Sequence, residues 1–241
     1  MADLSAARSN LAPSGKLRVG INFQNNLLTA RDPVTKAPRG IALDLAWELG
    51  RRLGVPVEIV SYESAGALAE SAGKGEWEVA FLGAEPQRAN EISFTDAYLE
   101  IEATYLVPAG SPIKTIADVD RKGVSIMVPA KAAYDLYLTR TIKNATLSRV
   151  LGADAAFKKF VDDKMDVLAG LKPRLVEDHD RLPGSRLLDG RFTAVQQAVG
   201  TPKGHDIGAN YLREYVADIK ASGLVGRTIG KNGIRGVSVA P

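Results

Sequence analysis

The sequence contains no cysteine, only two histidines and two tryptophans, and aromatic residues make up 6% of the chain. Without cysteine the protein can form no disulfide, no thiolate nucleophile and no cysteine-ligated metal site. His179 and His205 stand far apart in polar segments, so their spacing predicts neither a metal pair nor a serine–histidine arrangement. We therefore expect no metal and no other cofactor.

The charge is nearly balanced, and long apolar runs are missing. Lys and Arg number 31 against 28 Asp and Glu, and a net charge of +3 is too small a surplus to predict a nucleic-acid partner. The longest stretch without a charged residue, 19–30, holds 12 residues and includes four side-chain amides, whereas a membrane span needs about 20 mostly apolar residues. The sequence thus predicts neither nucleic-acid binding nor membrane insertion.

The glycine-rich loops and nucleophile motifs of common enzymes are also missing. No phosphate-binding loop, dinucleotide fingerprint or Gly-x-Ser-x-Gly elbow occurs. Residues 1–15 are small, polar and unperiodic, so we expect a flexible lead-in. Asp3 and Arg8 interrupt any apolar stretch there, and the segment does not look like a signal peptide.

Strands and helices alternate along the remaining chain. A strand is expected at 17–22, and a helix begins after Gly40, with apolar residues every fourth position until Gly54 and Pro56 end it. Strands at 57–60 and 79–82 enclose a short helix at 65–72. This alternation predicts an α/β unit.

A second α/β series follows a long extended run at 99–107. Its elements are strands at 124–128 and 167–171 and helices that begin near Ala132 and Asp154. A further strand at 192–199 and helices at 207–221 and 224–231 then return the chain to its first unit.

Six segments in a fixed order carry a family resemblance: LRVG at 17–20, GIALDLA at 40–46, LGVPVE at 53–58, RANEISFTDAY at 88–98, GSPIKTIADV at 110–119 and IKASG at 219–223. In this order they resemble the bacterial extracellular solute-binding proteins of the amino-acid type, family 3. These proteins are the receptors of ABC importers. The resemblance extends from Lys16 to about Lys231.

The resemblance implies a two-lobed, periplasmic-binding-protein-like α/β fold, with two crossover strands as a hinge and a ligand cleft between the lobes. After a flexible segment at 1–15, residues 16–106 and 195–241 would form lobe 1, and residues 107–194 the inserted lobe 2. The second lobe carries 15 Lys and Arg against 11 Asp and Glu, a net charge of +4. We expect a monomer that binds a small solute without catalysis, with an ABC permease as partner if it is exported. The resemblance favours the periplasm; if the chain is complete, the missing signal peptide favours the cytoplasm.

Arg88 is the first candidate ligand-binding residue that the resemblance implies. It aligns with a family arginine that holds a ligand carboxylate, and a guanidinium donates two parallel hydrogen bonds to such a group. Glu85 and Gly83 lie in the same segment, where Gly83 replaces hydroxyl residues that the family often carries. A salt bridge from Arg88 to Glu85 or Glu91 is the structural alternative.

Three amides are further candidates. Asn22 and Asn25 follow the first strand, where amides can bind the uncharged polar part of a ligand or can simply shape a turn. Gln197 lies on the returning strand beside Gln196, and only one of two successive strand residues can point inward.

The second lobe holds two further candidates, Lys131 and Tyr134, near the start of an expected helix. Lys131 lies at the helix start, where free amides and a positive charge would bind an anion, or it is a solvated surface lysine. Tyr134 either covers the ligand or packs in the core.

Lys172 stands in Leu171-Lys172-Pro173, where amino-acid receptors often read Asp-Glu-Pro and the Asp receives the ligand ammonium. An ammonium would meet a positive charge here, so we favour a carboxylate without the amine over an ordinary α-amino acid. Alternatively, Lys172 points to solvent and another acid, such as Glu85, serves the ammonium.

Two other functions remain open. The same fold hosts enzymes similar to cyclohexadienyl dehydratase, which need an acid as proton donor, and Glu85 is the candidate for that role. Turnover of prephenate that is lost in Glu85→Gln would indicate this enzyme. A cytosolic ligand sensor is the third function, and cell fractionation would distinguish it from a transport receptor.

Overall fold

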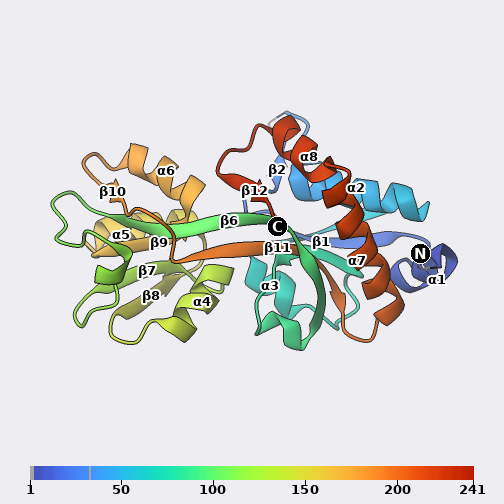
Figure 1. Ribbon diagram of the computed structural model, residues 1–241, viewed down its shortest axis with the longest axis horizontal. Coiled ribbons are helices and arrows are strands. Elements are labelled where there is room, and N and C mark those ends of the chain that lie inside the picture. Colours follow the sequence, from blue (N-terminus) through green and yellow to red (C-terminus); the bar gives the residue numbers. More distant parts are fainter. Residues whose placement is uncertain (1–2, 33) are drawn as a thin grey trace. The chain divides into compact units, whose positions relative to one another are not determined.

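Two long strands, β6 (Ile92–Val107) and β11 (Thr193–Pro202), run through the points at which the chain divides into two units. The computed structural model describes residues 3–32 and 34–241. Unit 1 holds the chain up to Glu100 together with Gln196–Pro241, and unit 2 holds Ile101–Val195 (Figure 1). The boundaries predicted from the sequence, after residues 106 and 194, fall in the same two strands.

The sheet of unit 1 has the strand order β4-β1-β5-β11-β6. Its remaining strands are β1 (Leu17–Asn22), β4 (Val57–Tyr62) and β5 (Val79–Gly83). Because β1 pairs in parallel with both β4 and β5, the carboxyl ends of these three strands lie at one edge of the sheet. A small hairpin of β2 (Ala30–Arg31) and β3 (Pro38–Arg39) follows β1, and β12 (Val237–Val239) pairs with β6.

The helices of unit 1 agree with the sequence pattern. They are α2 (Ile41–Leu53), α3 (Ala65–Glu70), the 3₁₀ helix η1 (Arg88–Asn90), α7 (Asp206–Ala221) and α8 (Leu224–Asn232). The apolar residues of α2 at every fourth position are buried, and Gly54 ends the helix with φ +69°, a left-handed conformation that favours glycine. Helix α8 contacts both α2 and α7, Tyr215 of α7 donates a hydrogen bond to the Leu45 carbonyl of α2, and α3 contacts β1, β4 and β5.

The first helix, α1 (Leu4–Leu11), corrects the prediction of a flexible lead-in over residues 1–15. Asp3 caps the helix, and Ala7 and Leu11 are completely buried in unit 1, where α1 contacts α7 and α2. A helix of 8 residues with only two buried positions is too short for its apolar periodicity to be recognised in the sequence.

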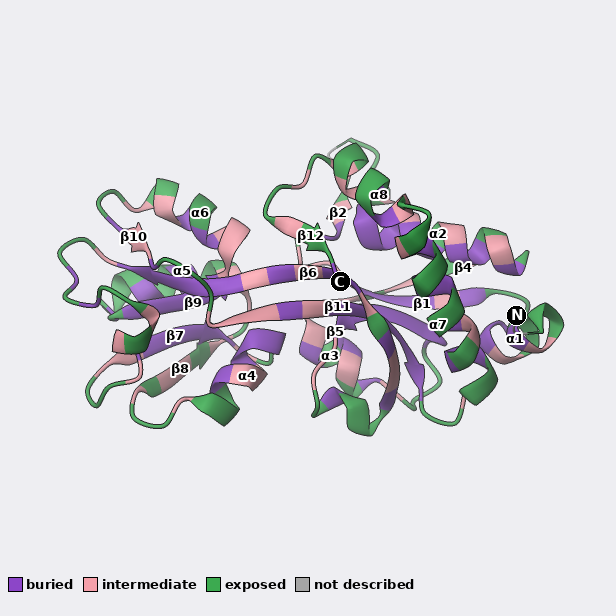
Figure 2. Ribbon diagram, in the orientation of Figure 1, coloured by how far each residue is buried: buried purple, intermediate pink, exposed green. Residues whose placement is uncertain are grey.

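The sheet of unit 2 has the order β6-β9-β7-β8, with β10 paired to β6. Its elements are the 3₁₀ helix η2 (Ile116–Asp118), β7 (Ser125–Pro129), α4 (Ala133–Thr141), β8 (Thr146–Val150), α5 (Ala153–Asp162), β9 (Val167–Leu171), α6 (Lys172–Arg181) and β10 (Arg186–Leu187). The sequence reading contained neither β8 nor α6. The β9 strand is buried except at its last residue, and helices cover both faces of the sheet (Figure 2).

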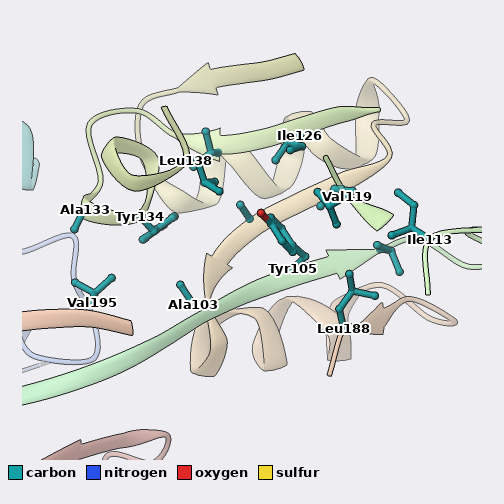
Figure 3. Packing of buried hydrophobic residues seen from close by; sticks show 14 residues of the cluster. Ala103, Tyr105, Ile113, Val119, Ile126, Ala133, Tyr134, Leu138, Leu188 and Val195 are labelled. Carbon is teal, nitrogen blue, oxygen red and sulfur yellow. The ribbon is translucent and has the colours of Figure 1, made fainter. Parts of the chain in front are cut away.

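Successive strand residues of unit 2 supply two separate cores. Tyr105 and Ile126 face α4 and pack with Leu138 (Figure 3), and Val167 belongs to the same cluster. Met127, Leu168 and Leu106 face α5 and α6, where Phe157, Phe160 and Leu175 cover them. No helix within the described ranges is long and apolar enough to cross a membrane.

Candidate functional site

Polar candidates from three strands meet at the carboxyl edge of the unit 1 sheet. Asn22 is the last residue of β1, and Gly83 is the last residue of β5. Strand β11 runs antiparallel to β5 and places Gln197 directly opposite Gly83. Open α/β sheets bind ligands beyond the carboxyl ends of their strands. The structure therefore brings three of the predicted residues to an edge that suits ligand binding.

Arg88 follows β5 at the same edge and is buried, with 6% of its surface exposed. Its Nη1 donates a hydrogen bond of 2.7 Å to the carbonyl oxygen of Gly83, and its backbone N–H donates to the carbonyl of Glu85 at 2.9 Å. Burial lowers the pKa of Arg88 to about 10, and the Glu85 carboxylate offsets part of this shift. A buried cation at a ligand-binding edge gains free energy when an anion binds to it. We call Asn22, Gly83, Arg88 and Gln197 the unit 1 edge.

The amides after β1 shape the loop that follows the strand. Asn22 Oδ1 accepts a hydrogen bond from the N–H of Gln24 at 3.0 Å, which is an Asx turn. The backbone carbonyl of Asn25 accepts from the N–H groups of Leu28 and Thr29. Asn25 Oδ1 is buried and has no hydrogen-bond partner among the described residues. A buried oxygen without a partner is costly, so Asn25 keeps an acceptor that a donor group could satisfy.

Gln197 and Gln196 lie on opposite faces of β11, as strand geometry requires. Gln197 is 4% exposed, whereas Gln196 is half-buried and donates from Nε2 to Glu100 Oε2 at 2.9 Å. Gln197 is therefore the glutamine whose side chain is buried, and it lies opposite Gly83.

Phe23 and Arg31 also lie at this edge, and the sequence reasoning did not select either of them. Phe23 directly follows Asn22, and the Arg31 guanidinium carbon lies 4.2 Å from the centroid of its ring. Seven residues separate the two in the chain, and neither helical nor strand periodicity relates them. The sequence offers only two hints of this contact: an aromatic residue directly after a strand, and a basic residue in the segment that follows.

The unit 2 candidate Lys131 follows β7 in a left-handed backbone conformation, with φ +59°. Its side chain is exposed, and its N–H donates to Asp135 Oδ2 at 2.8 Å. Asp135 is buried and also accepts from Arg149 Nε at 2.9 Å. Because Asp135 already occupies the start of α4, an anion bound there would compete with this carboxylate.

Tyr134 lies in the core of unit 2, with 8% of its surface exposed (Figure 3). Burial raises the pKa of its hydroxyl. Of the two interpretations offered by the sequence, packing in the core describes the position of this side chain.

Lys172 begins α6 and forms an ion pair with Glu102 of β6. Lys172 Nζ lies 2.8 Å from Glu102 Oε2, and Arg191 Nη1 lies 3.7 Å from Glu102 Oε1. The hydrogen bond from Lys172 lowers the pKa of Glu102 most, followed by the charges of Lys172 and Arg191. The charge of Lys172 is thus partly neutralised, which weakens the argument that it repels a ligand ammonium. The sequence reasoning missed Glu102, although Glu100 and Glu102 interrupt an otherwise apolar run.

Among the residues that the structure describes, no group of three His, Asp or Glu side chains could hold a metal ion. The polar side chains of the unit 1 edge are the amides of Asn22 and Gln197 and the guanidinium of Arg88. Such groups bind and orient a polar solute by hydrogen bonds and charge.

Comparison with known proteins gives one family. The model of the bacterial extracellular solute-binding proteins, family 3, matches residues 17–231. No curated protein sequence matches the chain significantly.

Many solved structures are similar. The solute receptor for L-cysteine of Neisseria gonorrhoeae is 21% identical, with a TM-score of 0.79 over 98% of this chain and 96% of that one. An amino acid ABC transporter substrate-binding protein from Streptococcus pneumoniae, bound to L-arginine, is 17% identical, with a TM-score of 0.76 over 97% of this chain and 99% of that one. The ancestral amino acid-binding protein AncCDT-1, a precursor of cyclohexadienyl dehydratase, is 20% identical, with a TM-score of 0.77 over 93% and 98%. At these identities the similarity shows a shared two-lobed α/β fold.

Proposed function

Because the chain belongs to the bacterial extracellular solute-binding proteins, family 3, we propose that it binds a small carboxylate or amino acid and delivers it to an ABC transporter. In this proposal Arg88 binds the carboxylate of the solute. The similar structures include receptors for L-cysteine and L-arginine, which supports a solute of amino-acid size.

The position of Arg88 is the observation that carries the proposal. Its guanidinium is buried at the unit 1 edge, and its Nη1 donates to the Gly83 carbonyl at 2.7 Å. Burial lowers the pKa of Arg88 only to about 10, so the group stays positively charged at neutral pH. A carboxylate would form charge-assisted hydrogen bonds with this cation and offset the cost of its burial.

The amide groups of the unit 1 edge would hold the rest of the solute. Asn22 and Gln197 offer both donors and acceptors, and Asn25 Oδ1 offers an acceptor. Within unit 2, Glu102 pairs with Lys172, so the charge of this lysine is no reason to exclude a solute that carries an ammonium. The residues present are therefore compatible with an α-amino acid as well as with a carboxylate that lacks the amine.

Calorimetry on the purified protein tests the role of Arg88. A thermal-shift screen of carboxylates and amino acids first identifies the solutes that stabilise the wild type. We expect Arg88→Gln to weaken their binding by at least roughly 30-fold, because the variant removes a charged partner from a buried contact. Arg88→Lys keeps the positive charge but loses the planar guanidinium, so its affinity for the solute should lie between those of the wild type and Arg88→Gln.

Arg186→Gln is the matched control, since Arg186 Nη2 also donates to a backbone carbonyl, that of Ile113, at 2.7 Å. It should bind solute as the wild type does. The proposal would be refuted if no carboxylate or amino acid in the screen stabilised the protein. It would also be refuted if the wild type and Arg88→Gln bound the solute with equal affinity.

A further inference from the structure

An exposed guanidinium covers an aromatic ring at the carboxyl ends of β1 and β4. Arg31 of β2 stacks on Phe23, the residue that follows Asn22, at 4.2 Å from the ring centroid. The N–H of Phe23 donates to the carbonyl of Tyr62, the last residue of β4, at 3.2 Å. Arg31 Nη2 also donates to Ser61 Oγ of β4 at 3.2 Å. Ring, hydroxyl and strand ends together hold the guanidinium at this edge of the sheet.

The contacts of Arg31 within the described part of the chain are all with neutral groups. Besides Phe23 and Ser61, its Nη1 donates to the backbone carbonyl of Lys36 at 3.5 Å. These contacts fix the orientation of the guanidinium and leave its positive charge without a carboxylate among the described residues. An exposed cation held in this way is preorganised for an anion, since little side-chain entropy remains to be lost on binding.

Two arginines therefore belong to the same sheet edge. Arg88 Nη1 contacts Gly83 at the end of β5, and Arg31 covers Phe23 beyond the end of β1. Strands β1 and β5 are paired neighbours, with Ile21 opposite Phe81, so Phe23 and Gly83 each lie two residues past the same pair. A solute that reaches from one arginine to the other would meet two positive charges. A second acidic group would be attracted there, and an ammonium or guanidinium would be repelled.

We propose that Arg31 is a specificity-determining residue, which selects solutes that carry a second acidic group besides the carboxylate bound by Arg88. The inference rests on the proposed function and names the solute class: dicarboxylates and acidic amino acids. The stacked Phe23 ring holds the Arg31 guanidinium, and cationic solutes find this face of the ring already covered by a cation.

Calorimetry with matched pairs of solutes tests the inference. Each pair differs only in one acidic group: glutamate and glutamine, aspartate and asparagine, succinate and succinamate. For the wild type we expect the acid of at least one pair to bind at least roughly 10-fold tighter than its amide, the value of one charge-assisted hydrogen bond. In Arg31→Gln this ratio should fall toward one, while the affinity for the amide changes little.

Arg39→Gln is the control, because Arg39 is an exposed arginine of the same hairpin, on strand β3. It should keep the wild-type ratio. A merely structural role of Arg31 would lower the affinity for acid and amide alike and would leave their ratio unchanged, which would overturn the inference.

The failure of the inference and that of the proposed function give different results. If the wild type binds solutes in a way that depends on Arg88 but prefers no acid over its amide, the role of Arg31 is refuted and the proposed function stands. If the wild type binds no carboxylate, or binds carboxylates independently of Arg88, both are refuted.

Discussion

Two neighbouring arginines lower the pKa of Glu48, a residue on the surface of α2. Its carboxylate accepts hydrogen bonds from Arg51 Nε and Arg52 Nε, each at 2.7 Å. These contacts, led by the hydrogen bond from Arg51, lower the pKa of Glu48 to about 2. Arg52 also contacts Asp218 of α7 at 2.7 Å, so the cluster joins α2 to α7 within unit 1.

This shift predicts an acid-dependent contribution to stability. The folded state favours the ionised form of Glu48, so its contribution is fully present above the ordinary glutamate pKa and is lost as the pH falls toward about 2. Urea unfolding at pH 7 should show Glu48→Gln to be less stable than the wild type, and the difference should shrink between pH 5 and pH 2.5. A difference that stays constant over this range would contradict the assigned pKa.

Some residues of the candidate site can be predicted from the sequence, and others cannot. Gly83, Arg88 and Gln197 were candidates because of a family motif and a polar interruption in a strand, and parallel and antiparallel pairing brings them together. Arg31 was missed, since its stacking on Phe23 depends on the path of a hairpin. Glu102 was missed because its partner Lys172 is 70 residues away in the chain.

Helix α1 connects the ends of two other helices of unit 1. Arg8 Nε donates to the carbonyl of Leu53, the last residue of α2, at 2.6 Å. Asn10 Oδ1 accepts from the N–H of Gly208, in the first turn of α7, at 2.9 Å. Helix ends leave such carbonyl and amide groups without partners inside the helix, so α1 supplies what α2 and α7 lack.

A pair of leucines tests whether α1 is an integral part of unit 1. Leu11 is completely buried, so Leu11→Ala should lower the free energy of unfolding by about 2–5 kcal/mol. Leu4, on the same helix, is 42% exposed, and Leu4→Ala should change it by less than about 0.5 kcal/mol. Urea denaturation measures both. Equal and small effects would show that α1 is not docked in solution.

At the element scale, strongly patterned segments were predictable and weakly patterned ones were not. The apolar period of α2 and its Gly54 end are visible in the sequence, and so are the buried strands β5 and β9. Strand β8 was missed because none of its residues is buried. Helix α6 begins directly after the expected strand at 167–171 and carries Pro173 in its first turn, where proline is tolerated, so no separate helix start marks it in the sequence.

For the whole molecule, the division into units locates the net charge. Unit 2 carries 15 Lys and Arg against 12 Asp and Glu, so its net charge is +3 and that of unit 1 is zero. The predicted lobe of +4 differed by one charge, that of Glu102, which belongs to unit 2. The surplus of basic residues therefore lies entirely in unit 2.

A crystal structure of the protein with a solute that binds in calorimetry tests the central claim most directly. We predict that the oxygens of the solute carboxylate lie about 2.8 Å from the guanidinium nitrogens of Arg88, the usual length of such charge-assisted hydrogen bonds. A solute bound without any contact to Arg88 would contradict the claim.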